Sequence, residues 1–125
     1  MKHLLDVNVL LAYLIQQHQD NGKVTAWLSA NPEIALCPIS ELGFLRISTT
    51  AKLGFPMASA RRTLEGFAGK FKAERIPDDL PALASHPRTS NQVTDHYLAD
   101  LAAKHGLKLA TLDAGLKHPS AQLIS

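Results

Sequence analysis

Short apolar runs alternate with longer amphipathic segments along this chain. HLLDV, IALCPI and KLATL each have the length of a buried strand, and AQLIS predicts a short final strand. In MASARRTLEGFAGKF the apolar residues recur with a helical period, and NQVTDHYLADLAAKH predicts a second clear helix that Gly106 ends. Because strands alternate with helices, the pattern predicts an α/β fold with a central, mainly parallel β-sheet flanked by α-helices.

Three further helices and one irregular region complete the pattern. One helix follows HLLDV directly and runs through Tyr13, a second is VTAWLSA, and a third is SELGFLRISTTAKL, which ends at Gly54. Residues 73–90 contain three prolines, which predict an irregular connection with one strand turn at 74–77.

Length and composition indicate an ordinary folded protein. The chain has 125 residues, of which 46% are hydrophobic, so we expect a single domain, residues 1–125, with its own core. Cys37 is the single cysteine, which excludes an internal disulfide and suits the cytoplasm. MKHLLDVNVLLAYLI resembles a signal peptide, but Asp6 and Asn8 interrupt its apolar run and no small-x-small cleavage site follows. The run is also too short to span a bilayer, so we expect no association with a membrane.

The net charge of +2 is unevenly distributed. Residues 46–75 contain seven basic and two acidic side chains, whereas the rest of the chain contains six basic and nine acidic ones. A basic middle segment is compatible with RNA binding, and the candidate residues are Arg46, Lys52, Arg61 and Arg62. A solvated face of lysines and arginines is the simpler explanation when charge alone is considered.

Two carboxylates directly follow predicted strands. Asp6 interrupts the apolar start of the chain, and Asp113 comes after KLATL. The carboxyl ends of parallel strands meet at one edge of a sheet, where ligands bind, so we expect both side chains at that edge. An ionised carboxylate is costly to bury unless something pairs with it, so Asp6 needs a partner.

Two more acids, Glu41 and Asp95, lie in the first turns of predicted helices, where a helix dipole alone would favour them. If they point to the same edge as the two aspartates, four carboxylates converge, and they stay ionised together only beside a cation. Such oxygen ligands suit Mg²⁺ or Mn²⁺, ions that serve phosphodiester hydrolysis. On the helix wheel, His96 and Asp100 point elsewhere, and we expect both on the surface, with Asp100 free or in a partner contact.

Four stretches, LLDVNVLLAYL, CPISELGFLR, TDHYLADLA and LATLDAGL, together resemble the PIN-domain ribonucleases, and among them the VapC-like toxins of toxin–antitoxin pairs. They occur in the family's order and span nearly the whole chain. The resemblance implies a PIN-like fold and cleavage of RNA that depends on Mg²⁺ or Mn²⁺. It also implies a small antitoxin partner and a homodimer.

The resemblance maps the family's acidic positions onto Asp6, Glu41, Asp95 and Asp113. It implies that the three aspartates ligate the metal and that Glu41 ligates it or orients a water molecule on it. Asn8 would support Asp6 or cap the helix that follows, and Thr111, two residues before Asp113, would have a supporting role. Some PIN nucleases carry a further acid where this chain has Ala114 and Gly115, so we expect one tightly held ion.

Two other functions fit parts of the sequence. DVNVL is similar to the start of haloacid-dehalogenase-like phosphohydrolases, but Asn8 stands where that mechanism needs a second acid, and an amide cannot give up a proton in this way. The second alternative is a non-catalytic module that binds RNA or a partner through the basic middle segment. The presence of all four acids disfavours it.

Overall fold

The computed structural model describes all residues of the chain, from Met1 to Ser125. In chain order, the elements are β1 (His3–Leu5), α1 (Val7–Leu14), α2 (Asn21–Ala30), β2 (Ile34–Leu36), α3 (Pro38–Ser48), α4 (Met57–Phe71), β3 (Glu74–Arg75), the 3₁₀ helices η1 (Ala82–Ala84) and η2 (Ser90–Gln92), α5 (Val93–Lys104), β4 (Lys108–Thr111) and β5 (Ala121–Leu123). None of these helices has both the length and the apolar surface that crossing a membrane requires.

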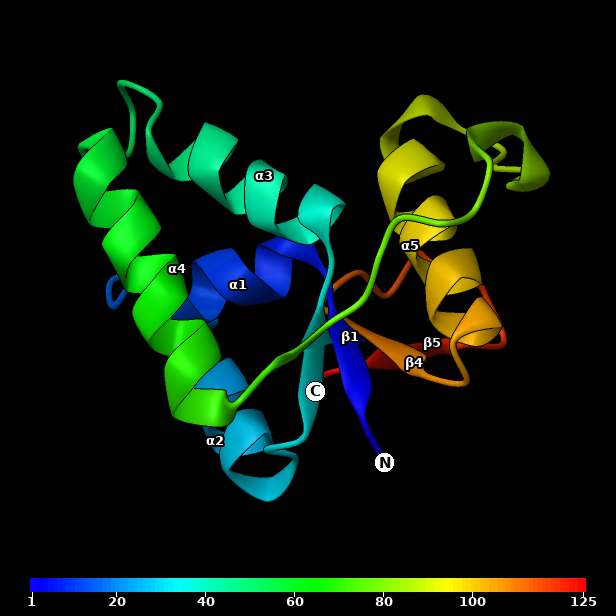
Figure 1. Ribbon diagram of the computed structural model, residues 1–125, viewed down its shortest axis with the longest axis horizontal. Coiled ribbons are helices and arrows are strands. Elements are labelled where there is room, and N and C mark those ends of the chain that lie inside the picture. The colour runs from blue at the N-terminus through cyan, green and yellow to red at the C-terminus, as the bar shows by residue number, and fades with distance from the viewer.

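The five strands form one parallel sheet in the order β3-β2-β1-β4-β5. β1 is central, and its Leu4 pairs with Ala35 of β2 and with Leu109 of β4. Strands that are buried on both faces need continuous apolar sequence, which the short runs of this chain supply. The predicted α/β fold with a parallel sheet is therefore confirmed, and the carboxyl ends of all strands lie along one edge (Figure 1).

Helices cover both faces of the sheet (Figure 1). The first four helices pack on one face, where Leu5 and Phe44 belong to one buried cluster. α5 packs on the other face, where Leu4, Leu98 and Leu109 belong to a second cluster. Leu4 and Leu5 point to opposite faces because side chains alternate along a strand. Each fully buried leucine contributes roughly 1.5–3 kcal/mol, so β1 is held firmly from both sides.

α3 is shorter than the sequence predicts. The pattern predicts a helix up to Gly54, whereas α3 ends at Ser48. The hydroxyls of Thr49 and Thr50 donate to carbonyl oxygens of the last turn at 2.7 and 2.8 Å. The same two carbonyls also accept from the backbone amides of Thr49 and Thr50, at 3.3 and 3.2 Å, so the threonine hydroxyls compete with the backbone for the acceptors of the last turn, which favours the end of the helix here.

α1 and α3 pack closely at Gly43. A Cβ atom placed on Gly43 would lie 2.5 Å from Cγ2 of Val7, the first residue of α1. Val7 is β-branched and stiff at χ1, so its side chain cannot turn away without strain. The close contact holds the start of α1 against α3.

Gly43→Ala should therefore destabilise the protein. We expect the free energy of unfolding to fall by about 1–3 kcal/mol, because the new methyl group overpacks the contact with Val7. Gly66→Ala is the matched control, since Gly66 is also helical but has no atom within 4 Å of its Cβ position. The control should gain about 0.5–1 kcal/mol from helix propensity. Urea denaturation of both variants measures their free energies of unfolding. Equal changes in the two variants would disprove the close contact between Gly43 and Val7.

Candidate metal centre

Asp6 lies at the centre of the carboxyl edge and is 1% exposed. It caps the N-terminus of α1, since its Oδ1 accepts from the backbone amide of Asn8 at 3.0 Å. Its Oδ2 accepts from the hydroxyl of Thr111, at the end of the neighbouring strand β4, at 2.9 Å. No loop separates β1 from α1, so the fold forces this carboxylate into the interior.

The surroundings of Asp6 disfavour its charged form. Burial raises the pKa of Asp6 above its ordinary value, and the nearby charge of Asp113 adds to this effect. The hydrogen bonds from Asn8 and Thr111 act in the opposite direction but do not outweigh the burial. Asp6 is therefore a buried acid that protein hydrogen bonds stabilise only in part.

Asp113 follows β4, and Thr111 links it to Asp6. The hydroxyl of Thr111 donates to Asp6 and accepts from the backbone amide of Asp113 at 3.1 Å. Asp113 also accepts a hydrogen bond from the Gly115 amide at 2.8 Å through Oδ1. Thr111 thus lies where its predicted supporting role requires. Asn8 contacts Asp6 through its backbone, while its side chain is exposed.

Asp95 joins these two aspartates from the opposite side of the edge, in the first turn of α5. Burial is the largest reason why the pKa of Asp95 rises to about 6, and the charges of Asp6 and Asp113 raise it further. Because the charges of Asp6 and Asp113 both act on Asp95, the three carboxylates form one electrostatic cluster. We call Asp6, Asp95 and Asp113 the aspartate cluster.

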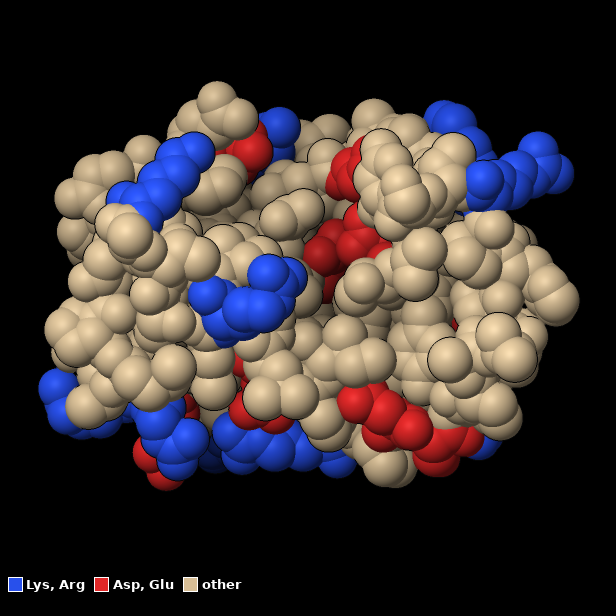
Figure 2. All heavy atoms as spheres, turned by 90° about the horizontal axis from the view of Figure 1, so that it is seen from above, with Lys and Arg blue, Asp and Glu red and all other residues tan.

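A groove of about 580 Å³ leads to the cluster. Asp6, Asn8 and Asp95 line it together with Arg46 of α3 and Asn91 of η2. Figure 2 looks onto this edge and shows acidic side chains gathered in a hollow, with lysine and arginine side chains around it. The groove is wide enough to bring a polar ligand to the carboxylates.

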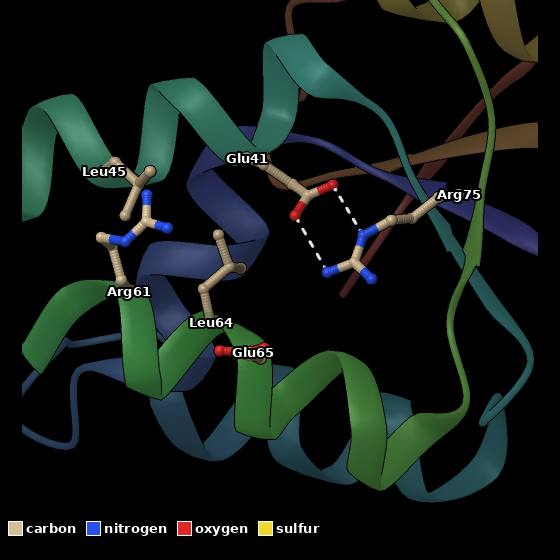
Figure 3. A pocket seen from close by; sticks show the side chains of 6 residues that line it. All are labelled: Glu41, Leu45, Arg61, Leu64, Glu65 and Arg75. Carbon is tan, nitrogen blue, oxygen red and sulfur yellow. Dashed lines mark hydrogen bonds and ion pairs between the residues drawn. The ribbon is translucent and has the colours of Figure 1, made fainter. Parts of the chain in front are cut away.

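The structure does not bring Glu41 into the aspartate cluster. Its carboxylate forms a bidentate ion pair with Arg75, at 3.1 and 3.2 Å, in a separate hollow between α3 and α4 (Figure 3). The residues of α3 that line the groove are instead on another side of the helix, among them Leu42 and Arg46. From the first-turn position of Glu41, the sequence predicts that its carboxylate lies beside those of the aspartates. In the structure, Glu41 is on the same face of α3 as Leu45, and this face is directed towards α4.

Of the four basic residues predicted to bind RNA, only Arg46 lines the groove. Lys52 lines a different hollow beside α1, and Arg61 lines the hollow that contains Glu41. Arg62 lies on the exposed side of α4, where it donates to Ser59 at 3.4 Å. The basic middle segment therefore does not form one continuous surface around the acids.

His96 and Asp100 are not the free surface residues that the sequence predicts. The carboxylate of Asp100 lies 3.1 Å from His96 Nδ1 and 2.7 Å from His118 Nε2. Burial raises the pKa of Asp100, but hydrogen bonds from His118 and Ser85 outweigh it, so the net pKa lies below the ordinary value. The spacing of His96 and Asp100 fits a pair on one helix face, but the sequence gives no sign that His118 joins them.

The aspartate cluster fits a hard divalent cation. Neither Asp6, Asp95 nor Asp113 forms an ion pair with a lysine, arginine or histidine. Neighbouring carboxylates without a cationic partner, two of them with raised pKa values, are the donor set that Mg²⁺ or Mn²⁺ prefers. These three residues could therefore hold one such ion.

Asp95 should make the stability of the metal-free protein depend on pH. A carboxyl with a folded pKa of about 6 favours folding at low pH, and this contribution is lost as the pH rises through that value. In chelator, we expect Asp95→Asn to be more stable than wild type at pH 8, by on the order of 1 kcal/mol after solvent screening. The difference should vanish near pH 4. If urea denaturation finds Asp95→Asn less stable than wild type at pH 8, other groups of the protein compensate the negative charge of Asp95, and no cation is needed.

Comparisons with known proteins show the family of this chain. A family model described as the PIN domain matches residues 3–121. Ribonuclease VapC38 of Mycobacterium tuberculosis is 35% identical, with 90% of this chain and 86% of that protein covered. Ribonuclease VapC29 of the same species is 33% identical, with 94% of this chain and 90% of that protein covered.

Two solved structures share the fold. A chain of VapBC2 from Rickettsia felis, bound to a DNA fragment from the promoter, has a TM-score of 0.65 at 16% identity and covers 98% of this chain and 97% of its own. A chain of FitAcB from Neisseria gonorrhoeae has a TM-score of 0.60 at 25% identity and covers 92% of this chain and 89% of its own. The predicted resemblance is confirmed, and the chain belongs to the PIN-domain family, with the VapC ribonucleases among its relatives.

Proposed function

We propose that this protein is the toxin of a toxin–antitoxin pair and hydrolyses phosphodiester bonds within RNA, using one Mg²⁺ or Mn²⁺ ion held by the aspartate cluster. The observation that carries the proposal is the cluster itself. Asp6 and Asp95 line a groove, burial and nearby carboxylate charges raise the pKa of both, and neither they nor Asp113 has a cationic partner. The VapC relatives are ribonucleases, and PIN-domain nucleases generally depend on divalent metals.

Each residue of the cluster has a distinct task in this proposal. Asp6 is fixed by the cap and by Thr111, so it offers the ion an oxygen whose position the fold determines. Asp95 and Asp113 complete the set from α5 and from the end of β4. When bound, the ion supplies positive charge beside the scissile phosphate and acts as a Lewis acid.

The groove fits a single-stranded RNA better than a duplex. Arg46 offers a positive charge for a phosphate, while Asn8, Asn91 and Thr94 offer amide and hydroxyl groups for sugars and phosphates. These groups lie beside the cluster, where a strand crossing the groove would pass. Unpaired RNA can bend to present one phosphate to the carboxylates, whereas a duplex is stiff.

A protein partner is also part of the proposal. VapBC2 and FitAcB are among the solved structures that share the fold, which supports an antitoxin for this chain. Leu42, Met57 and Val93 are large hydrophobic residues that are more than half exposed, and they offer apolar area for a protein contact. An antitoxin and a second copy of the chain are the proposed partners.

The proposed location is the cytoplasm, because the proposed substrate is RNA and Cys37 is a free, buried thiol.

Cleavage of RNA by purified variants tests the proposal. With Mg²⁺, Asp6→Asn, Asp95→Asn and Asp113→Asn should each lose activity by about 100-fold or more, because each loses a metal ligand. Glu41→Gln should lose less than about tenfold, since Glu41 is held by Arg75 outside the cluster. Glu65→Gln, in the same hollow as Glu41, is the control and should match wild type.

Two results would contradict the assignment. Undiminished cleavage by Asp6→Asn would trace the activity to a contaminating nuclease. If Glu41→Gln were as inactive as Asp113→Asn, Glu41 would have to leave Arg75 and reach the ion during the reaction. Glu41 would then have the role at the metal that the family resemblance implies.

A further inference from the structure

A second cluster of polar side chains on α5 lies outside the groove. Asp100 accepts from His118 Nε2 at 2.7 Å, and its other oxygen lies 3.1 Å from His96 Nδ1. The hydroxyl of Ser85 is 2.9 Å from the same nitrogen of His96. The His118 side chain is only 8% exposed, so its bond to Asp100 is well shielded from water.

Two histidines and a carboxylate at such distances suggest a metal site, but the hydrogen bonds of His118 oppose one. The backbone amide of Ser120 donates to His118 Nδ1 at 3.0 Å, so Nδ1 carries the lone pair. The hydrogen of the neutral ring is then on Nε2, which donates to Asp100. A metal on Nε2 would force a hydrogen onto Nδ1, directly against the Ser120 amide.

Ser85, His96 and Asp100 do not form a catalytic triad either. In a triad, the serine and the carboxylate bind opposite nitrogens of the histidine. Here both approach Nδ1 of His96. The cluster therefore fits a structural role, in which it attaches one segment to another, better than a catalytic role.

Asp100 joins α5 to the segment that carries Asp113. α5 provides Asp95, and residues 112–120 provide Asp113 and His118. One other hydrogen bond joins this segment to the start of α5, from the Gln92 side chain to the Gly115 carbonyl, and it is exposed. The half-buried bond between Asp100 and His118 involves a charged acceptor, so it is the stronger of the two.

We propose that Asp100 and His118 form a clamp that fixes the segment of Asp113 against α5 and thereby sets the spacing between Asp95 and Asp113. Asp100 and His118 are positioning residues in this view, since they touch neither the ion nor RNA. The role in metal binding rests on the proposed function, whereas the clamp itself does not. A metal ligand that is held loosely binds its ion less tightly. Removing a residue that orients a ligand typically lowers the metal affinity 10–100-fold.

The chain offers a matched control on the same helix. His105, at the C-terminal end of α5, lies 2.8 Å from Asp79 and forms a second pair of a histidine with an aspartate. This pair is about 15 Å along the helix from Asp95. Asp79→Ala removes a bond of the same kind without touching the segment that carries Asp113.

Hydrogen exchange measures the clamp without metal or RNA. The amides of Gly115, Leu116 and Ser120 donate hydrogen bonds within the segment, and the amide of Asp113 donates to Thr111 at the end of β4. In Asp100→Ala we expect them to exchange about tenfold faster or more, because the segment opens more often. Asp100→Asn keeps an oxygen for His118 and should exchange nearly as wild type, and Asp79→Ala should leave these amides unchanged. Unchanged exchange in Asp100→Ala would overturn the clamp.

Mn²⁺ titration then measures the consequence for the aspartate cluster. Asp100→Ala should bind Mn²⁺ about tenfold more weakly or worse, and saturating Mn²⁺ should restore most of its RNA cleavage. Faster exchange with unchanged Mn²⁺ affinity would make the clamp purely structural and overturn the positioning role. Tight Zn²⁺ binding that survives Asp6→Asn but is lost in Asp100→Ala would overturn it in favour of a metal site. A wild type that neither binds Mn²⁺ nor cleaves RNA would instead refute the proposed function, and the positioning role with it.

Discussion

The buried carboxylate of Asp6 is the interaction on which the rest of the site depends. Its backbone amide donates to Ala110 of β4, and its side chain accepts from the Asn8 amide and the Thr111 hydroxyl. One residue thus joins the central strand, the first helix and the neighbouring strand. The cost is a charge in the interior that hydrogen bonds offset only in part, and Asp95 and Asp113 increase this cost rather than reduce it. A cation in the groove would turn these repelling charges into ligands.

The parallel sheet explains why these acids meet. β1 and β4 are neighbours, so residues that follow them in sequence, Asp6 and Asp113, emerge side by side. α5 packs against the sheet with its first turn at the same edge, which brings Asp95 opposite them (Figure 1). The segment after Asp113 has little regular structure of its own. Leu116 packs into the apolar cluster of α5, and the clamp of Asp100 and His118 adds a polar attachment to the same helix.

The sequence predicts the fold, and the positions of Asp6 and Asp113 after their strands, because both depend on local patterns. Apolar runs mark the strands, and an acid directly after a buried strand must lie at its carboxyl end. Glu41 shows where this reasoning fails, since first-turn position does not say which way a side chain points, and Arg75, from β3, draws it towards α4. His118 and Asp100 show a second limit, because 18 residues separate them in sequence and only tertiary packing brings them together.

The most direct test of this account is the thermal stability of the metal-free protein and its response to Mg²⁺. In chelator, Asp6→Asn should be as stable as wild type or more stable, because it removes one repelling charge and keeps an oxygen for the helix cap. Mg²⁺ should then stabilise the wild type by about 2.7 kcal/mol at one hundred times its dissociation constant, and Asp6→Asn much less. If millimolar Mg²⁺ leaves the melting temperature of the wild type unchanged, or raises that of Asp6→Asn equally, Asp6 is an ordinary buried acid and the cluster is not a metal site.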